Sequence, residues 1–183
     1  MTAPTSKPVF AIAPGSGDLP KLVLVAPAPA DGFQSPPGVH ERALALRKAQ
    51  DREALLRERK ALSPRDLPED QLRRAVERKL SVSDAHHNES LDSFMSSARG
   101  DLLREMNVPT LMIAGAADSL LPANLDDFRR LPHATLHVFS RVGHNIPAEV
   151  PGEFATVVAD FLEHGVVTAA TLRAAMIAAT PAR

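Results

Sequence analysis

Two residues that could share a proton occupy similar positions in the sequence. Asp118 and His144 each follow a short apolar run and stand in a loop. A carboxylate that accepts a hydrogen bond from an imidazole fixes the tautomer of the ring and stabilises its protonated form. The pair therefore predicts the acid and the base of a hydrolytic triad. No residue of the sequence stands out as the nucleophile that would complete it.

The runs that precede these two residues are expected to be strands of one sheet. Residues 110–114 are almost wholly apolar, which is typical of a parallel strand buried on both faces. Residues 136–139 form a second β-rich run, and Gly143 allows a sharp turn just before His144. Ligand chemistry in open α/β sheets lies at the carboxyl ends of the strands. Both chemical residues are therefore expected at the same edge of the sheet.

Each loop is expected to lead into a helix. Pro122 opens the first helix, and Pro151 stands near the start of the second, where its missing N–H is harmless. Gly165 is a suitable stop for the second helix. The apolar residues of this second helix recur at helical spacing: Phe154, Val157, Val158, Phe161 and Leu162. The pattern predicts an amphipathic helix that packs on a sheet.

The remaining segments are predicted in less detail. Residues 21–27 are expected to form another buried strand, and residues 9–12 a short one. Residues 36–105 are strongly charged and are expected to be helical, over 41–62, around Leu72, Val76 and Leu80, and over 90–106. Residues 166–183 are expected to be a tail with a helix over 168–179.

The segment from about residue 106 to 165 resembles the C-terminal end of α/β-hydrolase-fold proteins. The matching residues are Val108, Pro109, Thr110, Leu111, Gly115, Asp118, Pro122, Leu131, Pro132, Ala134, Gly143, His144, Glu149, Pro151, Phe154, Phe161 and Leu162. The resemblance implies an α/β fold class: a partial α/β-hydrolase fold with a mostly parallel short sheet flanked by helices. It also implies a core from 21–35 and 106–165, with 36–105 inserted as a helical lid.

The resemblance leaves the nucleophile and the acid open. The family order is nucleophile, acid, histidine, with the nucleophile in a G-x-S-x-G elbow, and the chain contains no such pentapeptide. Ser16, between Gly15 and Gly17, is a weak candidate; alternatively, residues 1–20 are a flexible leader. Because some family members carry the acid after the strand that corresponds to residues 21–27, Asp31 is the alternative to Asp118. As an Asp-Gly pair, Asp31 and Gly32 also suit a simple turn.

Composition limits the partners and cofactors. The chain has 183 residues, a net charge of −1 and no cysteine, tryptophan or tyrosine. These values do not suggest a nucleic-acid partner, and they exclude disulfides and thiolate metal sites. The sequence has no run typical of a membrane span, so a cytoplasmic protein without membrane partners is expected. His86 and His87 point in different directions on a helix, so no metal and no other cofactor is predicted.

Two functions remain open on the sequence alone. The first is a hydrolase that acts on an ester-like or related small-molecule substrate through Asp118 and His144. The second is a catalytically inactive, truncated hydrolase-fold protein that binds a ligand or a partner chain. An unpaired sheet edge promotes association, so a homo-oligomer or a companion chain that completes the sheet is expected. A third, weaker alternative treats residues 36–105 as a helical interaction module or as solvated surface helices.

Overall fold

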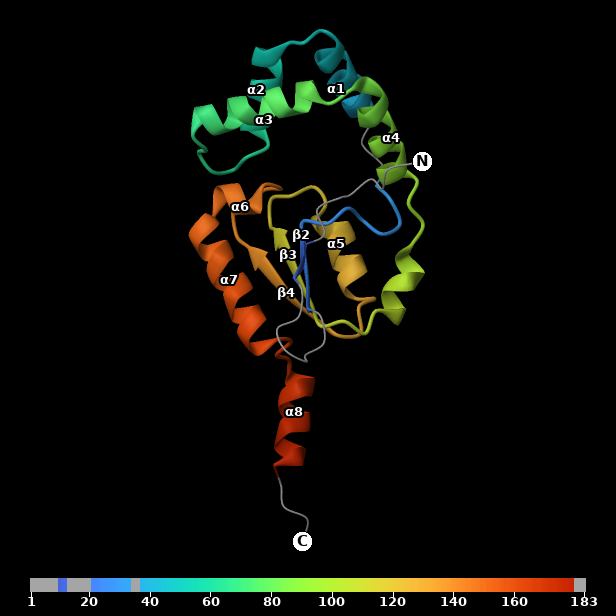
Figure 1. Cartoon of the computed structure of the whole chain (residues 1–183), viewed down its shortest axis with the longest axis vertical. Coiled ribbons are helices and arrows are strands. Elements are labelled where there is room, and N and C mark those ends of the chain that lie inside the picture. The colour runs from blue at the N-terminus through green and yellow to red at the C-terminus, as the bar shows by residue number, and fades with distance from the viewer. Residues whose placement is uncertain (1–9, 13–20, 34–36, 180–183) are drawn as a thin grey trace.

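The computed structural model describes residues 10–12, 21–33 and 37–179. Figure 1 shows three parts: an α/β body, a group of helices above the carboxyl ends of its strands, and a last helix that projects away from the body at the other end. We call the group α1–α4 the helical unit. The expected short sheet with flanking helices is confirmed.

The body contains a four-stranded sheet in the order β1-β2-β3-β4. β1 (Phe10–Ile12) pairs antiparallel with β2 (Lys21–Val25), whereas β2, β3 (Thr110–Gly115) and β4 (Ala134–Phe139) run parallel. Every residue of β3 is buried. The apolar run at 110–114 therefore forms the central strand, as its composition predicts.

Helices cover the two faces of this sheet. α5 (Leu121–Phe128) and α7 (Pro151–His164) lie on opposite sides of the strands, and the short α6 (Ile146–Glu149) precedes α7 (Figure 1). The main apolar cluster lies between α7 and the sheet: Val23, Ala26, Leu111, Ile113, Phe139, Val142, Ile146, Val150 and Phe161. α7 ends at His164, and Gly165 follows it with a φ of 69°, which glycine adopts easily. The predicted amphipathic helix and its stop are confirmed.

The helical unit is built on a second, smaller apolar cluster. Its helices are α1 (Val39–Lys48), α2 (Arg52–Ala61), α3 (Glu69–Ser81) and α4 (Asp84–Met95). The cluster consists of Leu55, Leu56, Leu72 and Val76, with Leu46, Leu67 and Leu80 packed against it. Most of it joins α2 to α3, which the spacing of Leu72, Val76 and Leu80 indicates.

The single helix expected over 41–62 is wrong, because the chain forms α1 and α2 there instead. Gln50 has a φ of 53°, which ends α1, and Asp51 caps α2 by accepting a hydrogen bond from the backbone N–H of Ala54 at 2.9 Å. An Asp at the N-cap satisfies an N–H that the new helix would leave unpaired. Good helix formers on both sides hide this boundary in the composition.

The helix expected over 90–106 is also wrong in its extent. α4 ends at Met95, and a 3₁₀ helix, η1 (Gly100–Glu105), follows after a break. The segment between them bonds to the loop after β2: Arg99 N–H and the Ser97 hydroxyl both donate to the carbonyl of Ala30, at 2.8 Å each. Tertiary hydrogen bonds replace those that a continuous helix would have made.

The predicted C-terminal helix is confirmed as α8 (Ala169–Ala178). Thr168 and Thr171 form a reciprocal capping box at its start. Figure 1 shows α8 extending beyond the body. The stretch Pro151–Ala178 is long and apolar enough to cross a membrane by length and composition, but Gly165 divides it into α7 and α8, and α7 packs on the sheet.

Candidate functional site

Asp118 and His144 are hydrogen-bonded to each other. The Nδ1 atom of His144 lies 2.9 Å from Oδ2 of Asp118. The other carboxylate oxygen, Oδ1, accepts the backbone N–H of Leu120 at 3.1 Å. Both oxygens of Asp118 are therefore engaged, and the imidazole is held with its Nε2 atom on the far side. The spacing of the two loops in sequence thus corresponds to direct contact in space.

The environment keeps Asp118 ionised. Burial raises the pKa of this carboxyl group, but the hydrogen bonds from His144 and from Leu120 and the charge of His144 outweigh burial. The net pKa of Asp118 lies below its ordinary value. The side chain of Asp118 is only 3% exposed, whereas that of His144 is 56% exposed. The acid is thus fixed in the interior, and the histidine is open to a reactant.

The acid loop and the histidine loop are joined through their backbones. Ala116 N–H donates to the carbonyl of Phe139, and Ala117 N–H donates to that of Val142, at 2.9 Å each. Gly115 lies so close to the other loop that a Cβ atom on it would be 2.3 Å from the carbonyl oxygen of Gly143. Real Cβ atoms do not approach other atoms so closely, so this position requires glycine.

A further residue, Glu149, holds the histidine loop from behind. Glu149 is buried, and its Oε2 accepts the backbone N–H of Gly143 at 3.0 Å. Its Oε1 has no hydrogen-bond partner among the described residues. The family pattern contains Glu149, but nothing in its spacing to His144 indicated this contact. The residue comes from α6, a one-turn helix that the sequence analysis did not predict.

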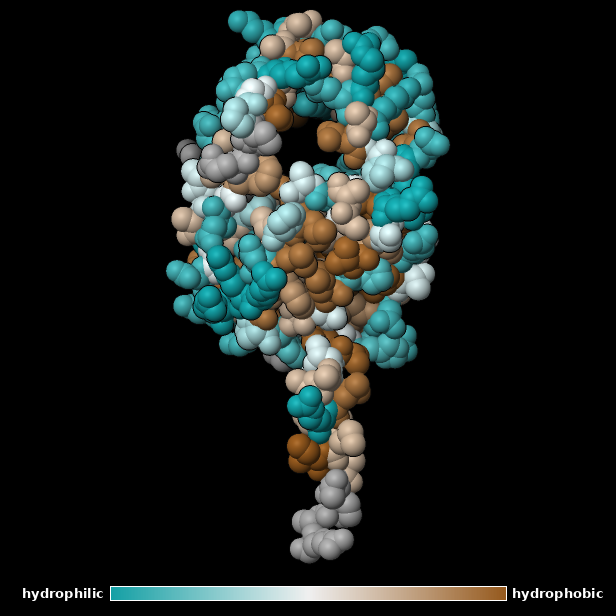
Figure 2. Space-filling view, turned by 180° about the vertical axis from the view of Figure 1, so that it is seen from behind, coloured by the Kyte–Doolittle hydropathy of each residue, from teal (hydrophilic) through white to brown (hydrophobic). Residues whose placement is uncertain are grey.

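The helical unit also contacts the histidine loop. The guanidinium of Arg59 in α2 donates from Nη2 to Oδ1 of Asn145 at 3.1 Å, next to His144. Arg65, in the loop after α2, donates to the carbonyl of Arg141 at 3.3 Å. Figure 2 shows an opening that passes between the helical unit and the body. The histidine loop, at the carboxyl end of β4, borders that part of the molecule.

The other candidates lie elsewhere. Asp31 accepts the backbone N–H of Gly100 at 2.7 Å and pairs with Arg130. The structure therefore gives Asp31 partners other than His144, and it is Asp118 that contacts the imidazole. Ser16 lies outside the described residues. Within the described ranges, no hydroxyl group is hydrogen-bonded to His144.

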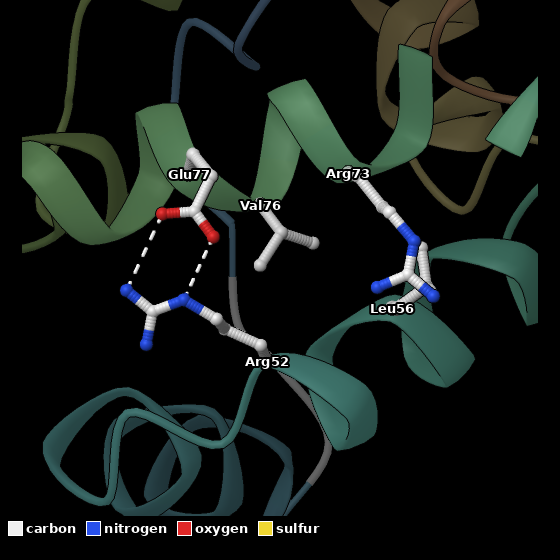
Figure 3. Close-up of a pocket in the computed structure, with 5 residues that line it drawn as sticks. All are labelled: Arg52, Leu56, Arg73, Val76 and Glu77. Atoms are coloured by element: carbon white, nitrogen blue, oxygen red, sulfur yellow. Dashed lines mark hydrogen bonds and ion pairs between the residues drawn. The ribbon is translucent and has the colours of Figure 1, made fainter. Parts of the chain in front are cut away.

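The described residues form no metal centre beside the pair, and the pocket that they line does not include Asp118 or His144. Among the described residues, no group of His, Asp and Glu could hold a metal ion. A pocket of about 60 Å³ lies between α2 and α3 (Figure 3). It is lined by Leu56, Val76 and the charged residues Arg52, Arg73 and Glu77, of which Arg52 and Glu77 pair with each other. Small-molecule sites are several times larger, so this pocket is a packing gap between helices.

Known proteins with similar sequences or structures are hydrolases or share their fold. No protein-family model matches the chain. A 2-hydroxy-6-oxononadienedioate/2-hydroxy-6-oxononatrienedioate hydrolase of Pseudomonas putida is 34% identical over 88 residues, which cover 42% of this chain and 31% of that protein. The chain thus matches less than a third of the length of this curated relative.

Solved structures match a larger part of the chain. An esterase from Exiguobacterium antarcticum matches with a TM-score of 0.64 and 20% identity, over 78% of this chain and 57% of that one. A bromoperoxidase from Bacillus anthracis matches with a TM-score of 0.65 and 18% identity, over 78% and 58%. A 2-hydroxy-6-oxo-6-phenylhexa-2,4-dienoate hydrolase from Rhodococcus sp. strain RHA1 gives 0.60 and 17%, over 78% and 55%. The chain therefore has the α/β-hydrolase fold over the part that these structures match.

Proposed function

We propose that this chain is the acid- and histidine-bearing part of a hydrolase that acts on an ester-like or related small substrate. The observation that carries the proposal is the hydrogen bond between His144 Nδ1 and the buried carboxylate of Asp118, at 2.9 Å. An imidazole held in this way presents a basic Nε2. The relatives support a hydrolytic reaction, because the curated relative and two of the solved structures are named as hydrolases or esterases.

In the proposed reaction, His144 acts as general base and then as general acid. Its Nε2 takes the proton of a hydroxyl nucleophile, or of a water molecule, as the oxygen bonds to the substrate carbonyl carbon. The same proton then passes to the leaving oxygen as its bond to the carbon breaks. Asp118 stays ionised and stabilises the imidazolium between the two steps. Among the described residues, no hydroxyl group is hydrogen-bonded to His144 as a nucleophile would be.

A second function, ligand or partner binding without hydrolysis, is favoured by one observation. Within the described residues, His144 has Asp118 as its hydrogen-bond partner, and no hydroxyl group is hydrogen-bonded to it. The described residues thus supply two of the three triad roles. In this alternative, the site would bind a small molecule, or the sheet would be completed by another copy or a companion chain. The helical unit, the proposed lid, would shape the site in either case.

Hydrolysis of p-nitrophenyl acetate by the purified chain separates the two functions. His144→Ala should lower the rate at least about 100-fold, because a positioned general base typically contributes that much or more. Asp118→Asn should also lower it, because the amide no longer fixes the tautomer of His144. His164→Ala is the control, since His164 is 55% exposed at the end of α7 and has no close bond to the site. Equal rates for the wild type and His144→Ala would leave the binding function.

A further inference from the structure

The cations of the helical unit differ in their partners and in their exposure. Six of them form ion pairs with a carboxylate: Arg42, Arg47, Arg52, Lys60, Arg73 and Arg74. Three others are exposed: Lys48, Arg57 and Arg78. Arg59 and Lys79 are half-buried, yet within the described ranges neither is paired with a carboxylate. Exposed cations without a partner are solvated by water, whereas half-buried ones lose part of that solvation. These two residues therefore require an explanation.

The two cations lie near each other and continue the buried faces of their helices. Arg59 follows Leu55 by one turn on α2, and Lys79 follows Ala75 by one turn on α3. Burial lowers the pKa of Lys79; the nearby charge of Glu58 opposes this effect, and the charges of Arg59 and Arg47 add to it.

Arg59 has a similar environment. Burial lowers its pKa, and the positive charge of Arg78 lowers it further. Glu58 cannot neutralise this group by itself, because its carboxylate already pairs with Arg42 at 2.9 Å. The region therefore has an excess of positive charge that the described residues do not balance.

The contact made by Arg59 places this charge beside the candidate site. One N–H of its guanidinium donates to Asn145, the residue after His144. Within the described residues, the Arg59 side chain makes this one hydrogen bond. Its other N–H groups therefore remain available to donate to an oxyanion, in the bidentate geometry typical of arginine. Figure 2 shows an opening between the helical unit and the body, the two parts that the hydrogen bond of Arg59 connects.

We propose that Arg59 and Lys79 bind an oxyanion, a carboxylate or a phosphate, of the small molecule that reacts at His144. This inference rests on the proposed function and names its substrate class: an ester-like molecule that carries a negative charge away from the reacting carbonyl group. An anion at this position would balance two desolvated cations and would fix the substrate relative to the imidazole. The helical unit would then select the substrate by charge.

The test is binding of defined probes to the full chain, measured by calorimetry and by the NMR shifts of the Asn145 side-chain amide. The probes are monomethyl succinate, inorganic phosphate and neutral dimethyl succinate. The wild type should bind at least one of the two anions and not the neutral diester. The anion that binds more tightly identifies the anionic group of the substrate as a carboxylate or a phosphate.

Variants identify the residues responsible. Arg59→Met and Lys79→Met should each weaken anion binding about tenfold or more, as expected for the loss of a charge-assisted hydrogen bond. Arg57→Met is the matched control, because Arg57 is an exposed cation on the same helix. Arg59→Met should unfold at the wild-type temperature or above, since it removes an unbalanced charge; this separates a ligand role from a structural one. Unchanged binding in both variants, or no anion binding by the wild type, would overturn the inference.

His144→Ala keeps this test independent of the proposed function. It should bind the anion as the wild type does, while losing ester turnover. Turnover without anion binding would refute the anion site alone. Anion binding without turnover in the wild type would refute hydrolysis alone.

Discussion

The α/β body and the helical unit use their carboxylates in different ways. In the body, the buried acids Asp118, Asp127 and Glu149 each accept a hydrogen bond from a backbone N–H, of Leu120, Ala30 and Gly143 respectively. In the helical unit, acids such as Glu53, Glu69 and Asp70 pair with exposed arginine or lysine side chains. The first arrangement fixes the conformation of loops, and the second consists of ion pairs on the exposed surface.

This difference determines how much each charge contributes. A buried carboxylate that satisfies a backbone N–H cannot be removed without leaving that donor unpaired, which costs about 1–3 kcal/mol. An exposed ion pair is screened by water and salt and contributes roughly 0–1 kcal/mol. The body therefore determines the geometry of the Asp118–His144 pair, while the helical unit depends on its small apolar cluster for stability.

The largest expected effect separates the stability of the two regions. Leu72→Ala removes a buried aliphatic side chain from the helical unit, and Ile113→Ala removes one from the sheet. Each should lower the unfolding free energy of the region that contains it by about 2–5 kcal/mol. Hydrogen exchange should show faster exchange of backbone amides in α1–α3 for Leu72→Ala, and throughout the chain for Ile113→Ala. Equal acceleration of exchange in β3 by both variants would show that the two regions unfold as one.

The next effect tests whether Glu149 positions the histidine loop. Glu149→Ala leaves the N–H of Gly143 without its acceptor and should lower the free energy of unfolding by about 1–3 kcal/mol. Glu149→Gln keeps an oxygen at the same place and should cost less. Chemical denaturation measures both variants. The same loss in both would mean that the negative charge of Glu149, and not its acceptor atom, stabilises the loop.

A smaller effect concerns pH. Burial raises the pKa of Asp127, although the hydrogen bond from Ala30 and the charge of Arg130 oppose it. Because the folded pKa is above the unfolded value of about 3.9, stability falls as pH rises from below that value through the folded pKa. Asp127→Asn keeps an acceptor for the N–H of Ala30. It should raise the free energy of unfolding by on the order of 1 kcal/mol or less at neutral pH.

The gain in Asp127→Asn should disappear as pH falls below the unfolded pKa, where the wild-type carboxyl group is protonated in both states. Thermal unfolding of both proteins between acid and neutral pH gives the difference. A variant that is less stable than the wild type at neutral pH would mean that the pairing of Asp127 with Arg130 outweighs the cost of burial.

The smallest effect is expected at the surface of the helical unit. Arg73 pairs with both Glu53 and Glu69, and all three side chains are at least half exposed. Arg73→Met should therefore change the free energy of unfolding by roughly 0–1 kcal/mol, and high salt should reduce the difference further. Denaturation with and without added salt measures it. A larger, salt-independent loss would point to packing of the Arg73 stem in the pocket of Figure 3.

The sequence predicted the body better than the helical unit for a physical reason. Buried parallel strands such as 110–114 need continuous apolar runs, and Gly165 was a recognisable helix stop, so these features were clear. Gln50 and Asp51, by contrast, end and restart a helix within a stretch of good helix formers. Its composition could not reveal the break, because the break depends on one backbone angle and one cap.

The candidate site shows the same limit. Two loops with chemical residues at the ends of neighbouring strands were enough to predict contact between Asp118 and His144. The partners of Asp31 could not be predicted, because Gly100 and Arg130 are both far from it in sequence. The contacts of Glu149 and Arg59 with the histidine loop were missed for a related reason, since neither contact has a local sequence pattern.

The close approach of Gly115 to the histidine loop has a consequence for how mutations in this chain should be interpreted. An added methyl group there would collide with the main-chain carbonyls of Val142 and Gly143, and these cannot move away as a flexible side chain could. Gly115→Ala would separate the two chemical residues while leaving both unchanged. In a mutational screen for activity, a residue with no side chain would then score as if it belonged to the reacting machinery.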